Sequence, residues 1–114
     1  FAIEDKDGYL IGNIMYYDID PIEKEAEIGI IIGDKMFLGK GYGTDALLTL
    51  TSHIFNTTNI ILLYLHTLTT NNRAKSFKKV GFKEVGPIRK EGMNFIKMEL
   101  SKNNWEKTNP QNNR

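Results

Sequence analysis

Apolar and polar residues follow one another along this chain in patterns that predict several strands and two helices. The mostly apolar runs 27–32, which is rich in β-branched residues, and 60–67 predict strands that are buried on both faces. The segment 95–100 alternates apolar and polar residues, which predicts a half-buried strand. The other predicted strands are 1–4, 9–17 and 82–86.

Helical periodicity follows the first buried run and precedes the second. Within 44–56, the apolar residues Ala46, Leu47, Leu50 and Ile54 recur at three- and four-residue spacing, as on one face of a helix. A shorter helix is predicted over 73–80, where Gly81 follows as the left-handed residue that often ends a helix. Because the longer helix lies between the two buried runs, we expect those strands to be parallel and joined by a right-handed crossover.

Turn residues connect the remaining strands as hairpins. Residues 5–8 (Asp-Lys-Asp-Gly) and the pair Glu91–Gly92 have turn composition. Gly12, inside a predicted strand, indicates a bulge or a close backbone approach. Pro87 is expected to break the strand that begins at residue 82. One parallel pair among antiparallel hairpins predicts an α+β (α/β) fold.

Composition and charge exclude several classes of function. The chain has 114 residues, a net charge of +1 and no cysteine. That length predicts one domain, and that charge gives no strong attraction to nucleic acid. Without cysteine there is no thiolate catalysis, and two histidines make a metal site unexpected. No apolar run is long enough for a membrane and no signal peptide is evident, so we expect a cytoplasmic protein.

A glycine-rich stretch joins the first buried strand to the longer helix. Free N–H groups at a helix start favour an anion, commonly a phosphate, and glycines let backbone approach it closely. The stretch runs Leu38, Gly39, Lys40, Gly41, Tyr42, Gly43, Thr44. It fits neither the dinucleotide fingerprint, which needs Gly at position 44, nor the Walker pattern, because Lys40 is followed by Gly41. A loop that merely turns a corner is the alternative.

Two motifs together resemble the GNAT superfamily of N-acetyltransferases. Gly41 and Gly43 match the family's pyrophosphate loop, [Arg/Gln]-x-x-Gly-x-[Gly/Ala], although Leu38 replaces its Arg or Gln. The segment 71–82 (Asn-Asn-Arg-Ala-Lys-Ser-Phe-Lys-Lys-Val-Gly-Phe) resembles the family's later Asn-x-x-Ala…Gly-Phe motif, in the right order and at the right distance. The ribosomal-protein N-terminal and polyamine acetyltransferase branches are the most similar.

The resemblance implies a mixed, mostly antiparallel twisted sheet with flanking helices and a splayed central parallel pair. It covers about residues 1–100, so we expect an acyl-CoA-binding domain over 1–102 that lacks the family's N-terminal strand and helices. A polar C-terminal tail would follow over 103–114, where Trp105 can pack back on the domain. Exposed edges at 1–4 would then favour a homodimer.

The resemblance also implies a site for acetyl-CoA, the co-substrate. The backbone of the strand segment Ile30, Ile31 and Ile32 would pair with the pantetheine arm, and the loop from Leu38 to Thr44 would hold the pyrophosphate. Further contacts are implied for Asn71, Phe77 and Lys79. The alternatives are a helix cap for Asn71 and a solvated lysine for Lys40.

The reaction needs a proton acceptor for the amine and a proton donor for the leaving thiolate. Many family members place a tyrosine where this chain has Phe77, which has no proton to give. Tyr64 and His66 are the nearby substitutes, although each is also explained as a structural strand residue. Glu27 stands where some members carry the base, or is a solvated carboxylate at a strand start.

These observations predict an enzyme that moves an acetyl group from acetyl-CoA to a primary amine. The acceptor would be a protein N-terminus, a polyamine or another small amine, and no membrane or nucleic-acid partner is expected. A non-catalytic CoA-binding module and a nucleotide-binding regulatory domain are the alternatives.

Overall fold

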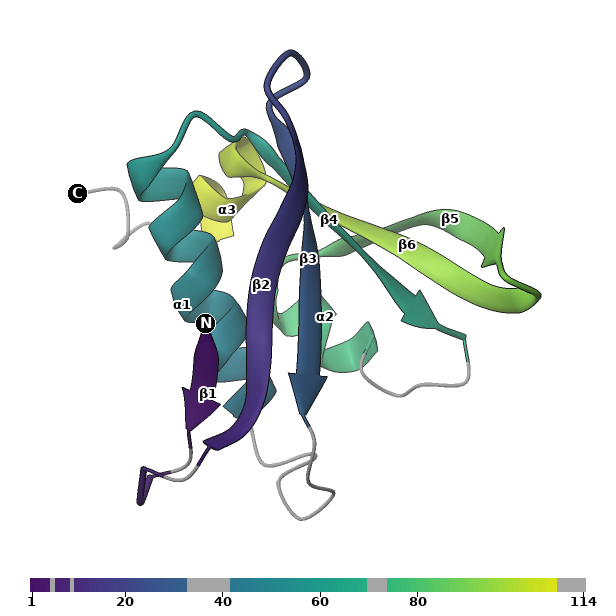
Figure 1. Cartoon of the computed structure of the whole chain (residues 1–114). Helices are drawn as coiled ribbons and strands as arrows, with labels where there is room; N and C mark the ends of the chain where they lie inside the picture. Colours follow the sequence, from purple (N-terminus) through teal and green to yellow (C-terminus); the bar gives the residue numbers. More distant parts are fainter. Residues whose placement is uncertain (5, 9, 33–41, 70–73, 109–114) are drawn as a thin grey trace.

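The computed structural model describes residues 1–4, 6–8, 10–32, 42–69 and 74–108. These form a twisted sheet with helices packed against it (Figure 1). In the described part of the chain, no helix is long and apolar enough to cross a membrane. In chain order the elements are β1 (Ala2–Glu4), β2 (Leu10–Asp20), β3 (Glu25–Ile32), α1 (Tyr42–Thr57), β4 (Leu62–Leu68), α2 (Ala74–Val80), β5 (Lys83–Lys90), β6 (Met93–Ser101) and α3 (Lys102–Thr108).

The sheet has the strand order β1-β2-β3-β4-β6-β5. Only the central neighbours β3 and β4 are parallel, and every other neighbouring pair is antiparallel. The predicted α+β fold with one central parallel pair is therefore confirmed. The sheet consists of two antiparallel halves, β1-β2-β3 and β4-β6-β5, which meet at the parallel pair.

All three helices contribute to one hydrophobic core on the same face of the sheet. The apolar stripe of α1 supplies Leu47, Leu50 and Ile54, each at most 4% exposed. Phe77 and Val80 come from α2, and Trp105 comes from α3. Figure 1 shows α1 and α2 behind β2 and β3, so the opposite face of the sheet carries no helix of the described chain.

Strand alternation separates the core face from this open face. In β4 the buried residues are Leu63, Leu65 and Thr67, whereas Tyr64 and His66 alternate with them and are partly exposed. In β3, Ala26 and Ile28 belong to the core. Glu27 therefore points to the open face, as Tyr64 and His66 do.

The short helix α2 ends as the sequence predicts. Gly81 has a φ of 118°, which glycine adopts without steric cost. Its N–H donates to Lys78 O at 3.0 Å, and Phe82 N–H donates to Phe77 O at 3.1 Å. This pair of bonds is the Schellman motif, and it turns the chain directly into β5.

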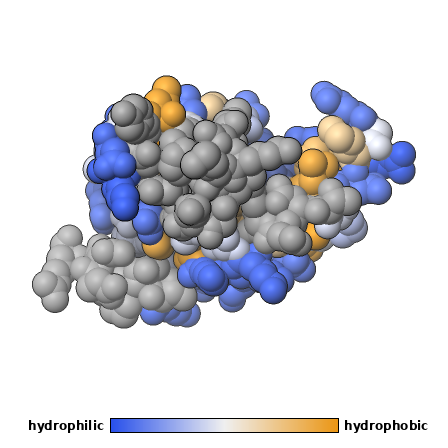
Figure 2. Space-filling model, turned by 90° about the horizontal axis from the view of Figure 1, so that it is seen from below, coloured by the Kyte–Doolittle hydropathy of each residue, from blue (hydrophilic) through white to orange (hydrophobic). Residues whose placement is uncertain are grey.

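The β5–β6 hairpin differs from the prediction at Pro87. We expected the strand to break there, but β5 continues to Lys90, and Pro87 pairs with Ile96. Proline is tolerated because β5 is an edge strand, and the irregularity lies earlier, between Glu84 and Gly86. The hairpin turn at Glu91–Gly92 is confirmed, with φ values of 51° and 77°. In Figure 2 this hairpin projects to the right and has a hydrophilic tip.

The segment after residue 102 begins with a helix. Lys102–Thr108 form α3, and Trp105 is 1% exposed. Its ring lies 5.3 Å from that of Phe55 in α1, measured between ring centroids. The segment expected as a polar tail therefore contributes one of the largest core side chains, and its last residues, 109–114, lie outside the described residues.

Candidate active site

The parallel strands β3 and β4 pair over a short distance and then separate. Their register comprises Glu25–Leu62, Ala26–Leu63 and Glu27–Tyr64. Beyond these pairs β3 continues to Ile32 alongside β2, and β4 continues to Leu68 alongside β6. The two halves of the sheet therefore diverge from Glu27 onward, as the splayed pair predicted from the family resemblance requires (Figure 1).

One hydrogen bond defines which backbone groups face this opening. Leu62 is the register partner of Glu25, and its N–H donates to Lys24 O at 3.3 Å. In a parallel pair a residue bonds to the two neighbours of its register partner, so Lys24 and Ala26 direct their backbone groups toward β4. By alternation, the N–H and C=O groups of Ile30 and Ile32 point the same way, past the last strand pair. Ile31 lies between them and directs its backbone groups toward β2, where it pairs with Asn13.

Glu27 occupies the apex of the opening and is the centre of a polar cluster. Its Oε2 accepts a hydrogen bond from the Tyr17 hydroxyl at 3.1 Å and lies 3.2 Å from His66 Nδ1. The side chains of Glu27 and His66 are only 12% and 11% exposed. We call Tyr17, Glu27 and His66 the Glu27 cluster. Three adjacent strands, β2, β3 and β4, each contribute one of its members.

Three local features bring Tyr17 to Glu27. The two residues are register partners in the β2–β3 pair. Immediately after Tyr17, β2 contains an irregularity, and Asp18 has a φ of 51° there. Such bulges redirect neighbouring side chains. Gly29 supplies space, because a Cβ there would lie 3.0 Å from Tyr17 Cε1.

Tyr64 and two lysines surround the cluster. The Tyr64 and His66 rings meet edge to face at 5.8 Å, and Lys97 Nζ lies 4.7 Å from the centre of the Tyr64 ring. Lys90 Nζ approaches His66 Nδ1 at 3.3 Å from the β5–β6 hairpin. Burial, followed by the charge of Glu27 and of acidic residues on β2 and β3, raises the pKa of Tyr64, so its hydroxyl is protonated at neutral pH and able to donate.

The structure thus brings together the three residues predicted from the sequence for proton transfer, Glu27, Tyr64 and His66, on one face at one point. The sequence analysis missed Tyr17, Lys90 and Lys97. No sequence motif identifies them. Tyr17 could have been placed opposite Glu27 only from the register of β2 and β3.

The residues expected to hold acetyl-CoA are only partly described. Thr44 lies in the first turn of α1, which begins at Tyr42 and Gly43. Phe77 is 6% exposed in the core, and Lys79 is exposed in the last turn of α2. The loop residues Leu38, Gly39, Lys40 and Gly41, as well as Asn71, lie outside the described residues.

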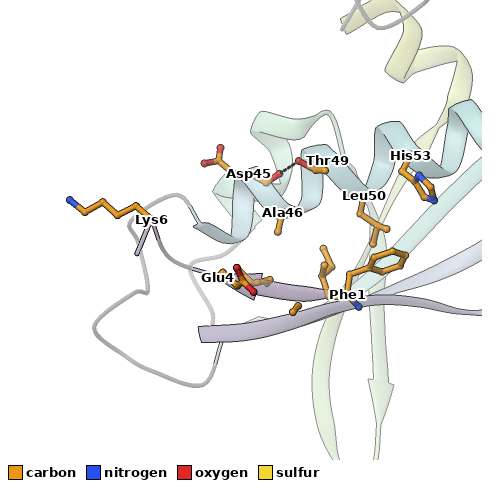
Figure 3. A pocket seen from close by; sticks show the side chains of 11 residues that line it. Phe1, Glu4, Lys6, Asp45, Ala46, Thr49, Leu50 and His53 are labelled. Carbon is orange, nitrogen blue, oxygen red and sulfur yellow. Dashed lines mark hydrogen bonds between the residues drawn. The ribbon is translucent and has the colours of Figure 1, made fainter. Parts of the chain in front are cut away.

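A separate cavity of about 570 Å³ lies on the helix face, between β1 and the first half of α1 (Figure 3). Phe1, Leu50 and His53 are among its lining residues, and Glu4 and Asp45 lie toward its other end. None of the residues predicted for chemistry lines it. The cavity is therefore distinct from the Glu27 cluster.

Comparison with known protein families gives one match. The acetyltransferase (GNAT) domain matches residues 1–83, which is more than half of the chain. No curated protein sequence matches.

Solved structures with the same architecture include several acetyltransferases. A mutant of the spermidine N-acetyltransferase SpeG from Vibrio cholerae superimposes with a TM-score of 0.79 at 26% identity, over 91% of this chain and 65% of that one. A probable acetyltransferase superimposes with a TM-score of 0.78 at 29% identity, over 87% of this chain and 59% of that one. An aminoglycoside acetyltransferase, AAC(6')-Ib in complex with coenzyme A, shares the fold with a TM-score of 0.77 at 21% identity, over 91% and 66%. The chain thus spans about two thirds or less of each of these proteins.

Proposed function

Because this chain belongs to the GNAT acetyltransferase family, we propose that it transfers an acetyl group from acetyl-CoA to a primary amine. The observation that carries the proposal is the coincidence of two features at one point. The parallel strands separate after Glu27, which leaves the Ile30 and Ile32 backbone groups directed into the opening, and the Glu27 cluster lies at its apex.

The backbone of β3 at the opening supports acetyl-CoA as the proposed co-substrate. Backbone groups that have lost a neighbouring strand can pair with an amide-containing chain, as the backbone of Ile30 and Ile32 would do with the pantetheine arm. The loop from Leu38 to Thr44, together with Asn71, Phe77 and Lys79, completes the proposed site. Acetyl-CoA would supply the activated acetyl thioester.

The chain's own residues would handle the protons. An alkyl ammonium group must lose a proton before its nitrogen can attack, and Glu27 is the proposed acceptor because it is a partly desolvated carboxylate on the open face. Tyr64 and His66 are the proposed donors for the departing sulfur, since Phe77 has no proton and lies in the core.

For the acceptor we propose a primary amine such as a polyamine, another small amine or a protein N-terminus. The similarity to a spermidine N-acetyltransferase supports testing polyamines first in a substrate panel. We further propose that the protein works in the cytoplasm, without nucleic acid or membrane as partner, and that it forms a homodimer. Equilibrium sedimentation tests the dimer, which a monomer at high concentration would contradict.

The proposal is tested by binding and by turnover. We expect acetyl-CoA to raise the melting temperature, since a ligand selective for the folded state stabilises it. The Gly41→Val substitution, in the loop that resembles the family's pyrophosphate loop, should abolish this shift. Gly86→Val is the matched control, because a Cβ at Gly86 meets no atom within 4 Å. Binding with no acetyl transfer to any amine in the panel would instead identify a CoA-binding module.

A further inference from the structure

We propose that Tyr17 is a positioning residue for the proton acceptor of this site. Its hydroxyl, together with His66 Nδ1, would hold the Glu27 carboxylate by Oε2, which leaves Oε1 to take the proton of the acceptor amine. This inference rests on the proposed function, because it assigns Tyr17 a role only if Glu27 accepts a proton during the reaction.

The two contacts come from opposite sides of Glu27. Tyr17 reaches it from β2 and His66 reaches it from β4, and within the described chain both contacts fall on the same carboxylate oxygen. A carboxylate oxygen that contacts a tyrosine hydroxyl and an imidazole nitrogen on the two neighbouring strands cannot rotate freely about its last bond. Fixed orientation is what a group that receives a proton in the transition state requires.

Tyr17 is suited to hold the carboxylate and unsuited to exchange protons with it. Tyr17 is 40% exposed, and partial burial of its hydroxyl, then the hydrogen bond to Glu27 and the negative charge of Glu27, raises the pKa of Tyr17 to about 12. The hydroxyl therefore stays protonated throughout the pH range of an assay. It is therefore a constant donor to the carboxylate.

Gly29 keeps this contact open. Because the Tyr17 ring edge lies 3.0 Å from the place where a Cβ would stand on Gly29, an alanine there must displace the ring. We expect Gly29→Ala to press on the Tyr17 ring and so to disturb its hydrogen bond to Glu27 without removing any polar group. It gives a second, chemically independent way to break the same hydrogen bond.

The charged groups near Glu27 can all influence how turnover depends on pH. The titratable or charged groups that face it directly or through one neighbour come from every strand around it: Tyr17, Asp18 and Asp20 from β2, Glu25 from β3, Tyr64 and His66 from β4, Lys90 from β5, and Lys97 and Glu99 from β6. Tyr17→Phe keeps the ring and every one of these other groups in place. Any change of the pH profile in that variant then reports the lost hydroxyl.

The experiment compares Tyr17→Phe with Tyr16→Phe, which removes the same hydroxyl from the neighbouring residue on the opposite face of β2. Two quantities are measured: the carbon-13 NMR titration of the Glu27 carboxyl in the free protein, and the pH profile of kcat/KM. A carboxylate that loses a donor binds a proton more readily. In Tyr17→Phe we therefore expect both midpoints to move to higher pH, by roughly 0.5 to 1 unit from the net strength of one hydrogen bond.

We also expect kcat to fall about five- to tenfold in Tyr17→Phe while KM for the amine stays constant. Gly29→Ala should reproduce the shift and add nothing to it in the double variant with Tyr17→Phe. Unchanged midpoints in both variants, with the wild-type protein active, would overturn the role of Tyr17 and leave the proposed function intact. If the wild-type protein acetylates no amine, the proposed function fails, while the carboxyl titration still decides whether Tyr17 holds Glu27.

Discussion

Replacing Glu27 with glutamine removes the proposed proton acceptor with almost no change of shape. The two contacts on Oε2 change from charge-assisted to neutral hydrogen bonds, a loss of about 1 kcal/mol each. Removal of a largely buried charge offsets part of this loss, because the carboxylate no longer has to be desolvated. We therefore expect the free energy of unfolding to fall by about 2 kcal/mol at most, which leaves most of the roughly 5–15 kcal/mol of a typical domain.

Turnover should respond far more strongly than stability. Loss of a general base costs roughly 10²–10⁴-fold in rate. The loss must shrink as pH rises, because the fraction of amine that is already deprotonated grows about tenfold per pH unit below the amine's own pKa, near 10 for an alkyl amine. At pH values near 10 the turnover of the variant and that of the wild-type protein should therefore converge.

The assay is kcat/KM for one small amine between pH 6 and 10, with the melting temperature measured for each protein. Glu25→Gln is the matched control, because it neutralises a carboxylate two residues away on the same strand and the same face. A loss of turnover in Glu27→Gln that stays constant across this range would refute the role of Glu27 as base. A water chain would then be the simpler proton acceptor.

The core and the open face give three further predictions. Trp105→Ala should lower the free energy of unfolding by about 3–5 kcal/mol in denaturant titrations, whereas exposed Asn103→Ala should change it little; a small effect of Trp105→Ala would show that α3 contributes little to the fold. The raised pKa of Tyr17, about 12, contributes stability that is complete below pH 10 and is lost as pH rises from 10 to 12, so Tyr17→Phe should flatten the alkaline decline of the melting temperature. Tyr64→Phe and His66→Ala should each lower turnover by roughly 10²-fold or more with unchanged acetyl-CoA affinity, since both side chains lie away from the helices; lost stability with normal turnover would return them to a structural role.

Hydrophobic patterning was sufficient for most of the fold. The apolar runs at 27–32 and 60–67 and the helix between them required a parallel pair, and Gly81 marked the end of α2 through its left-handed conformation. The expected burial of both faces was wrong for β4, where buried and partly exposed residues alternate. Patterning failed at Pro87, because whether a proline breaks a strand depends on which side of that strand has a neighbour. That information resides in the strand order and is absent from the local sequence.

The candidate site was predictable where its residues lie on a single strand. Tyr64 and His66 are two residues apart, so the alternation of a strand is by itself enough to place them on one face. Tyr17 could not be found this way, because its contact with Glu27 depends on the β2–β3 register, the irregularity at Asp18 and the absence of a side chain at Gly29. The helix that carries Trp105 could not be predicted either, since a single aromatic residue in a polar segment produces no hydrophobic periodicity.

The short register between β3 and β4 also has a mechanical consequence. Each antiparallel half of the sheet is held by long antiparallel registers, whereas the halves share three parallel residue pairs. Under load, or in native-state hydrogen exchange, this seam is where the sheet should part first, and the amides of Ile30 and His66 should exchange early. A ligand that forms hydrogen bonds with both β3 and β4 in the opening would link the two halves beyond their last residue pair. Its binding should therefore slow amide exchange on both strands at once.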